Sequence, residues 1–116
     1  MNESLVNTVI LITREGIGSA DVELQHKLFS TYLKLLLEND SLPAALCFYT
    51  DGVKLVVEGS PFLEHLSQLE QRGVRLISCS TCINYFKLAE KVKVGIVGGM
   101  PDILEAQTRA SKVITV

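Results

Sequence analysis

The chain of 116 residues is long enough for one domain with one core, and 47% of its residues are hydrophobic and 21% charged. A net charge of −2 without a basic stripe argues against nucleic-acid binding, because neutralising phosphates needs clustered Lys and Arg. No apolar run approaches the ~20 residues of a membrane span, and the N-terminus lacks the basic start of a signal peptide. We therefore expect a cytoplasmic protein without membrane contact.

Strand-like and helix-like segments alternate from the first residues to the last. Apolar runs bounded by turn residues predict strands at residues 5–12, 44–49, 74–77, 92–97 and 113–116. Helical spacing of apolar residues predicts helices at residues 21–38, 53–57, 60–73, 81–91 and 101–110. The alternation predicts one α/β domain over residues 1–116, built as a three-layer sandwich on a mostly parallel sheet.

The segment 21–38 carries two neighbouring apolar stripes. The first is Leu24, Leu28, Tyr32 and Leu35, and the second is Phe29, Leu33, Leu36 and Leu37. Together they are wider than the ~100° apolar face of an ordinary surface helix. Either neighbouring elements cover this helix well, or part of it meets another subunit, which would make the protein a homo-oligomer.

The sequence contains three cysteines, and two of them form a C-x-x-C pair where the third predicted strand passes into a helix. Cys47 lies within the second predicted strand and is interpreted as a small core residue. Amide groups at a helix N-terminus favour a thiolate, so Cys79 is predicted to be a reactive thiol. Cys79 is also expected to be more exposed than Cys82, which lies about one helical turn further along.

The C-x-x-C spacing by itself has three interpretations: a redox pair, a persulfide carrier, or two small residues that pack a tight turn. A structural zinc site is disfavoured, because His26 and His65 lie on separate predicted helices and too few ligands remain. No metal and no cofactor are expected. Gly98 and Gly99 could cradle an anion through their amides, although Asp102 and the acidic residue at 105 argue against it.

Four stretches spread over nearly the whole chain carry a family pattern: residues 16–24, residues 48–55 followed by 58–60, residues 73–86, and residues 94–103. They are similar to the opening of the first helix, the second-strand motif, the cysteine motif and the fourth-strand motif of the DsrE/DsrF-like sulfur-relay family. The chain most closely resembles the DsrE-like domain of YedF-type proteins, which are sulfurtransferase-like and linked to selenium metabolism.

The resemblance implies a five-stranded sheet, an oligomer, and a sulfur-accepting role for Cys79, with Cys82 as an auxiliary or resolving thiol. The residues expected to contact the substrate are Ser80, Thr81, Arg14, Gly98 and Gly99. Arg14 and Lys87 are candidate electrostatic helpers of the thiolate. The chain departs from the family pattern at Ser80, where glycine is usual, and at Gly98 or Gly99, where asparagine is usual.

YedF-type proteins also carry a TusA-like domain with a Cys-Pro motif, which this sequence lacks. We therefore expect a separate partner, such as a TusA-like protein, to donate or accept the sulfur, unless the sequence is part of a longer protein or the activity has changed. Two other functions stay open: an oligomeric binding or assembly protein without turnover, and a redox sensor that forms a Cys79–Cys82 disulfide.

Overall fold

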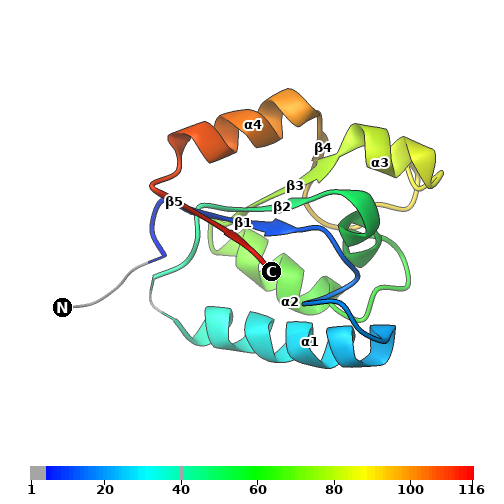
Figure 1. Ribbon diagram of the computed structural model, residues 1–116, viewed down its shortest axis with the longest axis horizontal. Coiled ribbons are helices and arrows are strands. Elements are labelled where there is room, and N and C mark those ends of the chain that lie inside the picture. The colour runs from blue at the N-terminus through cyan, green and yellow to red at the C-terminus, as the bar shows by residue number, and fades with distance from the viewer. Residues whose placement is uncertain (1–4, 40) are drawn as a thin grey trace.

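Five parallel strands form the centre of the protein, in the order β4-β3-β2-β1-β5 (Figure 1). The computed structural model describes residues 5–39 and 41–116. The strands are β1 (Thr8–Ile12), β2 (Ala45–Phe48), β3 (Arg75–Cys79), β4 (Ile96–Gly98) and β5 (Lys112–Thr115). The helices are α1 (Val22–Glu38), the 3₁₀ helix η1 (Thr50–Val56), α2 (Leu63–Gln71), α3 (Ser80–Tyr85) and α4 (Met100–Arg109).

Helices cover the two faces of the sheet unequally. Figure 1 shows α1 and α2 against one face and α4 against the other, with α3 and η1 at the edge where β2 and β3 end. All five residues of β1 and all four of β2 are buried. Central parallel strands are buried on both faces, which explains why their sequences read as continuous apolar runs rather than alternating ones. The predicted α/β class and five-stranded sheet are confirmed.

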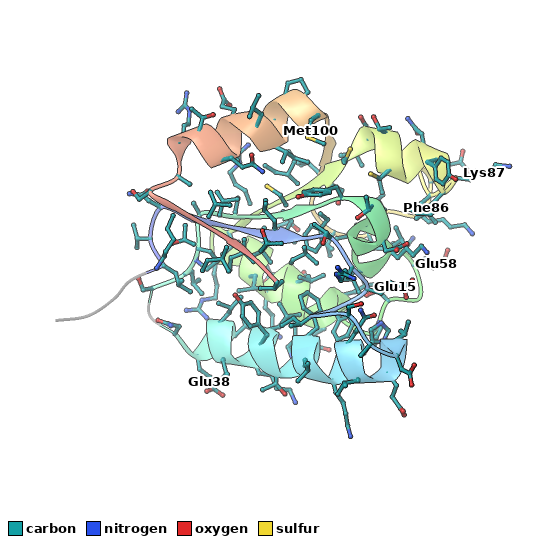
Figure 2. The ribbon with its side chains drawn as sticks, viewed as in Figure 1. Glu15, Glu38, Glu58, Phe86, Lys87 and Met100 are labelled. Carbon is teal, nitrogen blue, oxygen red and sulfur yellow. The ribbon has the colours of Figure 1, made fainter. Side chains whose placement is uncertain are left out.

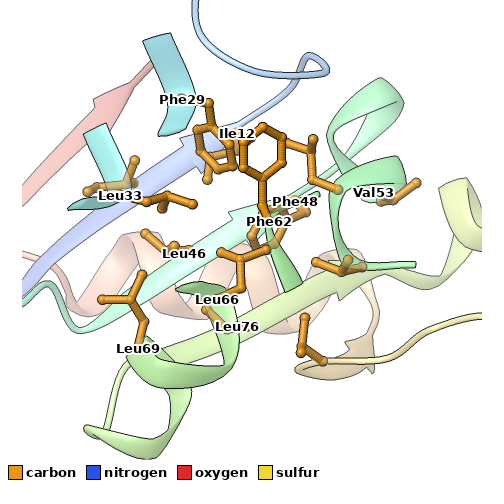
Figure 3. Packing of buried hydrophobic residues seen from close by; sticks show 14 of the residues in the cluster. Ile12, Phe29, Leu33, Leu46, Phe48, Val53, Phe62, Leu66, Leu69 and Leu76 are labelled. Carbon is orange, nitrogen blue, oxygen red and sulfur yellow. The ribbon is translucent and has the colours of Figure 1, made fainter. Parts of the chain in front are cut away.

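The larger hydrophobic cluster lies between the sheet, α1 and α2 (Figure 3). Phe29 and Phe62 meet edge to face with their ring centroids 4.9 Å apart, and neither is appreciably exposed. Full burial of side chains of this size contributes about 1.5–3 kcal/mol each to folding. The smaller cluster lies under α4, where Ala45, Cys47 and Ala106 are short enough to let the helix approach the sheet closely.

Several predicted boundaries are wrong. The first strand begins at Thr8 rather than at residue 5, and α3 ends at Tyr85 rather than at residue 91. Lys87, with φ of 59°, stands in the left-handed region, which stops a helix. The fourth strand is Ile96–Gly98 rather than 92–97, and Val92 forms an isolated antiparallel bridge to Val57 instead.

The two apolar stripes of α1 differ in burial. The second stripe forms the core face of the helix, with Phe29, Leu33 and Leu36 buried. The first stripe stays largely uncovered, since Leu28 is 46% and Leu35 59% exposed. Among the described residues, no helix combines the length and apolar character needed to cross a membrane.

The sheet also buries the thiol of Cys47, and burial raises its pKa from an ordinary 9.0 to about 11, while the nearby Arg75 charge lowers it slightly. Between pH 9 and about 11 the unfolded chain loses the thiol proton while the folded protein keeps it. The free energy of unfolding therefore falls as the pH rises through this range. We predict that Cys47→Ala removes an alkaline loss of stability of up to about 3 kcal/mol. Urea unfolding of both proteins between pH 8 and 11 measures it, and parallel curves for the two proteins would contradict it.

Candidate functional site

Two cysteines mark the edge of the sheet where the strands end. Cys79 is the last residue of β3 and the residue before α3, and Cys82 lies in the first turn of that helix. The predicted passage from strand to helix at Cys79 is therefore confirmed. Carboxyl ends of parallel strands are where α/β folds place their sites, because loops rather than strands continue there. Gly98 of β4 pairs directly with Cys79 in the sheet.

The expected order of exposure is wrong. Cys79 is only 1% exposed, whereas Cys82 is half-buried. Side chains two apart on a strand share a face, so Cys79 follows Ile77 into the small cluster under α4 that contains Ile103. Cys82 comes one helical turn later and lies at the border of both clusters, facing η1. A molecule that approaches from solvent therefore reaches Cys82 before Cys79.

The pKa of Cys79 is lowered although the side chain is buried. Burial alone raises it, but the amide and thiol of Cys82 and the amide and hydroxyl of Thr81 act as donors to the sulfur and outweigh burial. The amides of Thr81 and Cys82 lie in the first turn of α3, so they are the N-terminal helix amides that the sequence predicted beside Cys79. Cys79 is thus the sulfur that carries negative charge most readily.

The pKa of Cys82 shifts in the opposite direction. Burial raises it first, and the hydrogen bond to Cys79 and the negative charge there raise it further. The backbone N–H of Thr50 opposes both, donating to Cys82 Sγ at 3.1 Å. Two neighbouring sulfurs that share one proton titrate as a pair. When the pair loses one proton, the negative charge therefore falls preferentially on the buried Cys79 and the remaining proton on the accessible Cys82.

A pocket of about 280 Å³ opens beside Cys82 and gives the pair its contact with solvent. Its lining is mainly apolar and consists of Thr50, Asp51, Thr81, Cys82, Tyr85 and Phe86. The rings of Tyr85 and Phe86 meet edge to face at 5.2 Å. The ammonium of Lys54 lies 4.5 Å from the centre of the Phe86 ring, and it also pairs with Asp51 at 3.0 Å. The charge of Lys54 is therefore already compensated.

The structure brings together some of the predicted site residues. Thr81 contacts both the Cys79 sulfur and the pocket. Ser80 is half-buried beside Cys79 in the chain, and no hydrogen bond from it to either sulfur is present among the described residues. Gly98 lies beside Cys79, but the amide of Gly99 donates to Asp102 Oδ2 at 2.8 Å. Gly99 is therefore not free to cradle an anion, which corrects that expectation.

The two cations expected near the thiolate do not act on it. Arg14 lies in the loop after β1, where it forms an isolated bridge with Gly16, and its side chain is exposed. Lys87 lies at the far end of α3 and points away from the body of the protein (Figure 2). The pKa shifts of both thiols come from burial, nearby donors and each other. Neither Arg14 nor Lys87 is among the groups that shift these pKa values, so the described residues give their predicted helper role no support.

Sequence reasoning missed the contribution of Thr50. The stretch Thr50–Gly52 reads as an ordinary turn, and only the glycine signals unusual geometry. The turn follows β2 and meets α3, which is 32 residues away in sequence, so no local pattern reveals the contact with Cys82. Within residues 5–39 and 41–116, no group of three His, Cys, Asp or Glu side chains could hold a metal ion.

Comparison with known proteins yields a family and a fold. The model of the DsrE/DsrF-like family matches residues 17–116. Two similar structures are a protein of unknown function, MTH1491 from Methanobacterium thermoautotrophicum, with a TM-score of 0.69 and 22% identity, and the ychN protein from E. coli, with a TM-score of 0.68 and 16% identity. Each alignment covers 94% of this chain, with 97% of MTH1491 and 98% of ychN.

A third similar structure is the conserved protein of unknown function BT1422 from Bacteroides thetaiotaomicron, with a TM-score of 0.65, 13% identity, and 95% of each chain covered. No curated protein matches the chain. At these identities the structures support the fold alone. The finer resemblance to YedF-type proteins, with its selenium link, stays a prediction.

The coupling between the two thiols predicts how the reactivity of Cys82 depends on Cys79. Replacing Cys79 with alanine removes a negative charge and a hydrogen bond that both raise the pKa of Cys82. We predict that Cys82 in the Cys79→Ala variant reacts with iodoacetamide at lower pH than in the unchanged protein. Peptide mapping of the alkylated cysteine across a pH series measures the shift. An unchanged or higher midpoint would contradict the coupling, and Cys47→Ala serves as the control.

Proposed function

Because its residues 17–116 match the family model, the chain belongs to the DsrE/DsrF-like family, and we propose that it relays sulfur as a persulfide on the Cys79–Cys82 pair. Members of this family are generally oligomeric and relay sulfur. The observation that carries the proposal is the opposite shift of two adjacent thiols beside an open pocket. The sulfur with the lowered pKa is buried, and the sulfur with the raised pKa lines the pocket.

Burial assigns the first contact with the sulfur donor to Cys82. The Cys79 thiolate accepts the proton of Cys82, which leaves a thiolate on the accessible sulfur. This thiolate attacks the outer sulfur of a donor persulfide, R–S–SH. A bond forms between that sulfur and Cys82, the bond to the donor's inner sulfur breaks, and the donor leaves as R–S⁻. The product is Cys82–S–SH, and no net oxidation occurs.

Delivery repeats the same exchange in the other direction. A thiolate of the acceptor attacks the outer sulfur of Cys82–S–SH, and Cys82 leaves as a thiolate that can take back the proton from Cys79. Donor and acceptor are proposed to be separate thiol proteins, with a TusA-like protein as one candidate. The pocket lined by Tyr85 and Phe86 is mainly apolar, and the acidic residue in its lining, Asp51, is paired with Lys54. Such a surface suits the apolar side chains of a protein partner.

Sulfur loading tests this assignment directly. We expect intact-mass measurement after incubation with a cysteine desulfurase and cysteine to show a one-sulfur adduct on the unchanged protein, on Cys47→Ala and on Cys79→Ala. Cys82→Ala should show none, because the accessible nucleophile is lost. An adduct on Cys82→Ala that disappears in the double variant would move the acceptor role to Cys79. Absence of any adduct on the unchanged protein would rule out the carrier function.

The uncovered leucines of α1 support the proposal that the protein is a homo-oligomer. Leu24, Leu28 and Leu35 lie on one side of the helix and are all about half exposed. An aligned row of half-exposed leucines is unusual for a free surface, since packing it against a second subunit removes apolar area from water. The sequence left open whether neighbouring elements or another subunit cover this helix, and the exposure of the row favours the second alternative.

Changing this row should weaken self-association without unfolding the chain. We predict that Leu28→Glu lowers the apparent mass in sedimentation and weakens association at least about tenfold, because a half-exposed leucine is replaced by a charge. Lys34→Glu is the matched control, since Lys34 is exposed on the same helix outside the row. Equal masses for all three proteins would contradict the use of this face.

A further inference from the structure

We propose that Thr50 is a positioning residue of the sulfur site, whose strained backbone holds one amide against the accessible sulfur of Cys82. The proposal deepens the proposed function, since it depends on Cys82 being the sulfur that meets the donor. The contact itself is present in the structure whatever the protein transfers, with the amide nitrogen 3.1 Å from Cys82 Sγ.

The first observation is the backbone conformation of Thr50. Its φ of 49° lies in the left-handed region, which residues with a β-branched side chain rarely adopt. Strained residues of this kind persist only where surrounding contacts hold them, and they gather at functional sites. Two questions follow: which contacts hold Thr50 in this conformation, and what the conformation does at the site.

The restraint comes from the end of β1. The hydroxyl of Thr50 donates to the carbonyl of Thr13 at 2.6 Å, and it also lies 2.7 Å from the carbonyl of Tyr49. The amide of Tyr49 donates to the carbonyl of Ile12 at 3.2 Å. Gly52 presses so closely on that strand end that a β-carbon there would lie 2.0 Å from the Ile12 carbonyl oxygen. The turn is thus clamped onto β1 on both sides of Thr50.

The function of the strained conformation follows from the competition between the two sulfurs for the negative charge. The amides at the start of α3 support negative charge on Cys79, which is buried. Transfer from a donor in the pocket needs that charge on Cys82 instead. Among the described residues, the Thr50 amide is the backbone group that donates to Cys82 Sγ and so stabilises a thiolate there. Without it, the charge would have no backbone donor once it left Cys79.

The experiment compares three substitutions by the pH dependence of Cys82 alkylation. Thr50→Ser keeps the hydroxyl and should match the unchanged protein. Thr50→Val keeps the β-branch but loses the hydroxyl, so the strained turn relaxes and the amide leaves the sulfur. We expect Cys82 in Thr50→Val to be alkylated about tenfold more slowly at neutral pH, with its midpoint moved upward, since hydrogen bonds to charged groups are worth about a factor of ten or more.

Thr50→Gly separates strain from anchoring. Glycine adopts the left-handed region without cost but has no hydroxyl, so its alkylation profile should lie between those of the serine and valine variants. If Thr50→Val does not fold, the comparison of glycine with serine decides the question. Among the described residues, the titratable groups beside Cys82 are Cys79, Asp51 and Tyr85, together with Lys54, which contacts Asp51 and Phe86. All are unchanged in these variants.

Thr108→Val is the matched control, because it deletes a threonine hydroxyl that donates to the carbonyl of Leu104 in α4, away from the pocket. Identical alkylation profiles for Thr50→Gly, Thr50→Val and the unchanged protein would overturn the proposal. Alkylation is measured without any sulfur donor. A protein that never carries a persulfide could therefore still show the Thr50 effect, and a failure of one proposal is distinguishable from a failure of the other.

Discussion

The parallel pairing of β1, β2 and β3 is the constraint on which the site depends. Parallel strands in register end at the same edge, so the turn after β2 comes to lie against both the end of β1 and the helix after β3. Thr50 reaches Cys82 and Thr13 from this turn, although one is 32 residues away and the other 37. A shift of one residue in the register would turn Cys79 to the other face of the sheet.

At this edge of the sheet, burial and nearby hydrogen-bond donors make two chemically identical thiols differ in exposure and pKa. Cys79 is withdrawn under α4, yet the donors around it make it the easier sulfur to ionise. Cys82 is reachable, and burial and its neighbour Cys79 raise its pKa while the amide of Thr50 lowers it. The arrangement therefore places the sulfur with the lower pKa away from solvent and the sulfur with the higher pKa beside the pocket.

The surface carries two patches of exposed apolar side chains. Apolar side chains lie uncovered along α1, and others lie where β4 passes into α4, with Ile96, Met100 and Leu104 each more than half exposed (Figure 2 labels Met100). The opposite sides of α1 and α4 are buried in the core, whereas β4 is an edge strand with both Ile96 and Val97 exposed. An assembly of subunits would cover such patches, in agreement with the oligomers typical of the family.

Periodicity and composition determined the α/β class, the five strands, the core position of Cys47 and the place of Cys79 between a strand and a helix, because each depends on local pattern. The end of α3, the short fourth strand, the burial of Cys79 and the amide of Thr50 were decided only by tertiary structure. Each depends on what packs against a residue from a distant segment. Exposure of a strand-end side chain is set by the helix that crosses above it, and α4 begins 21 residues after Cys79 in the chain.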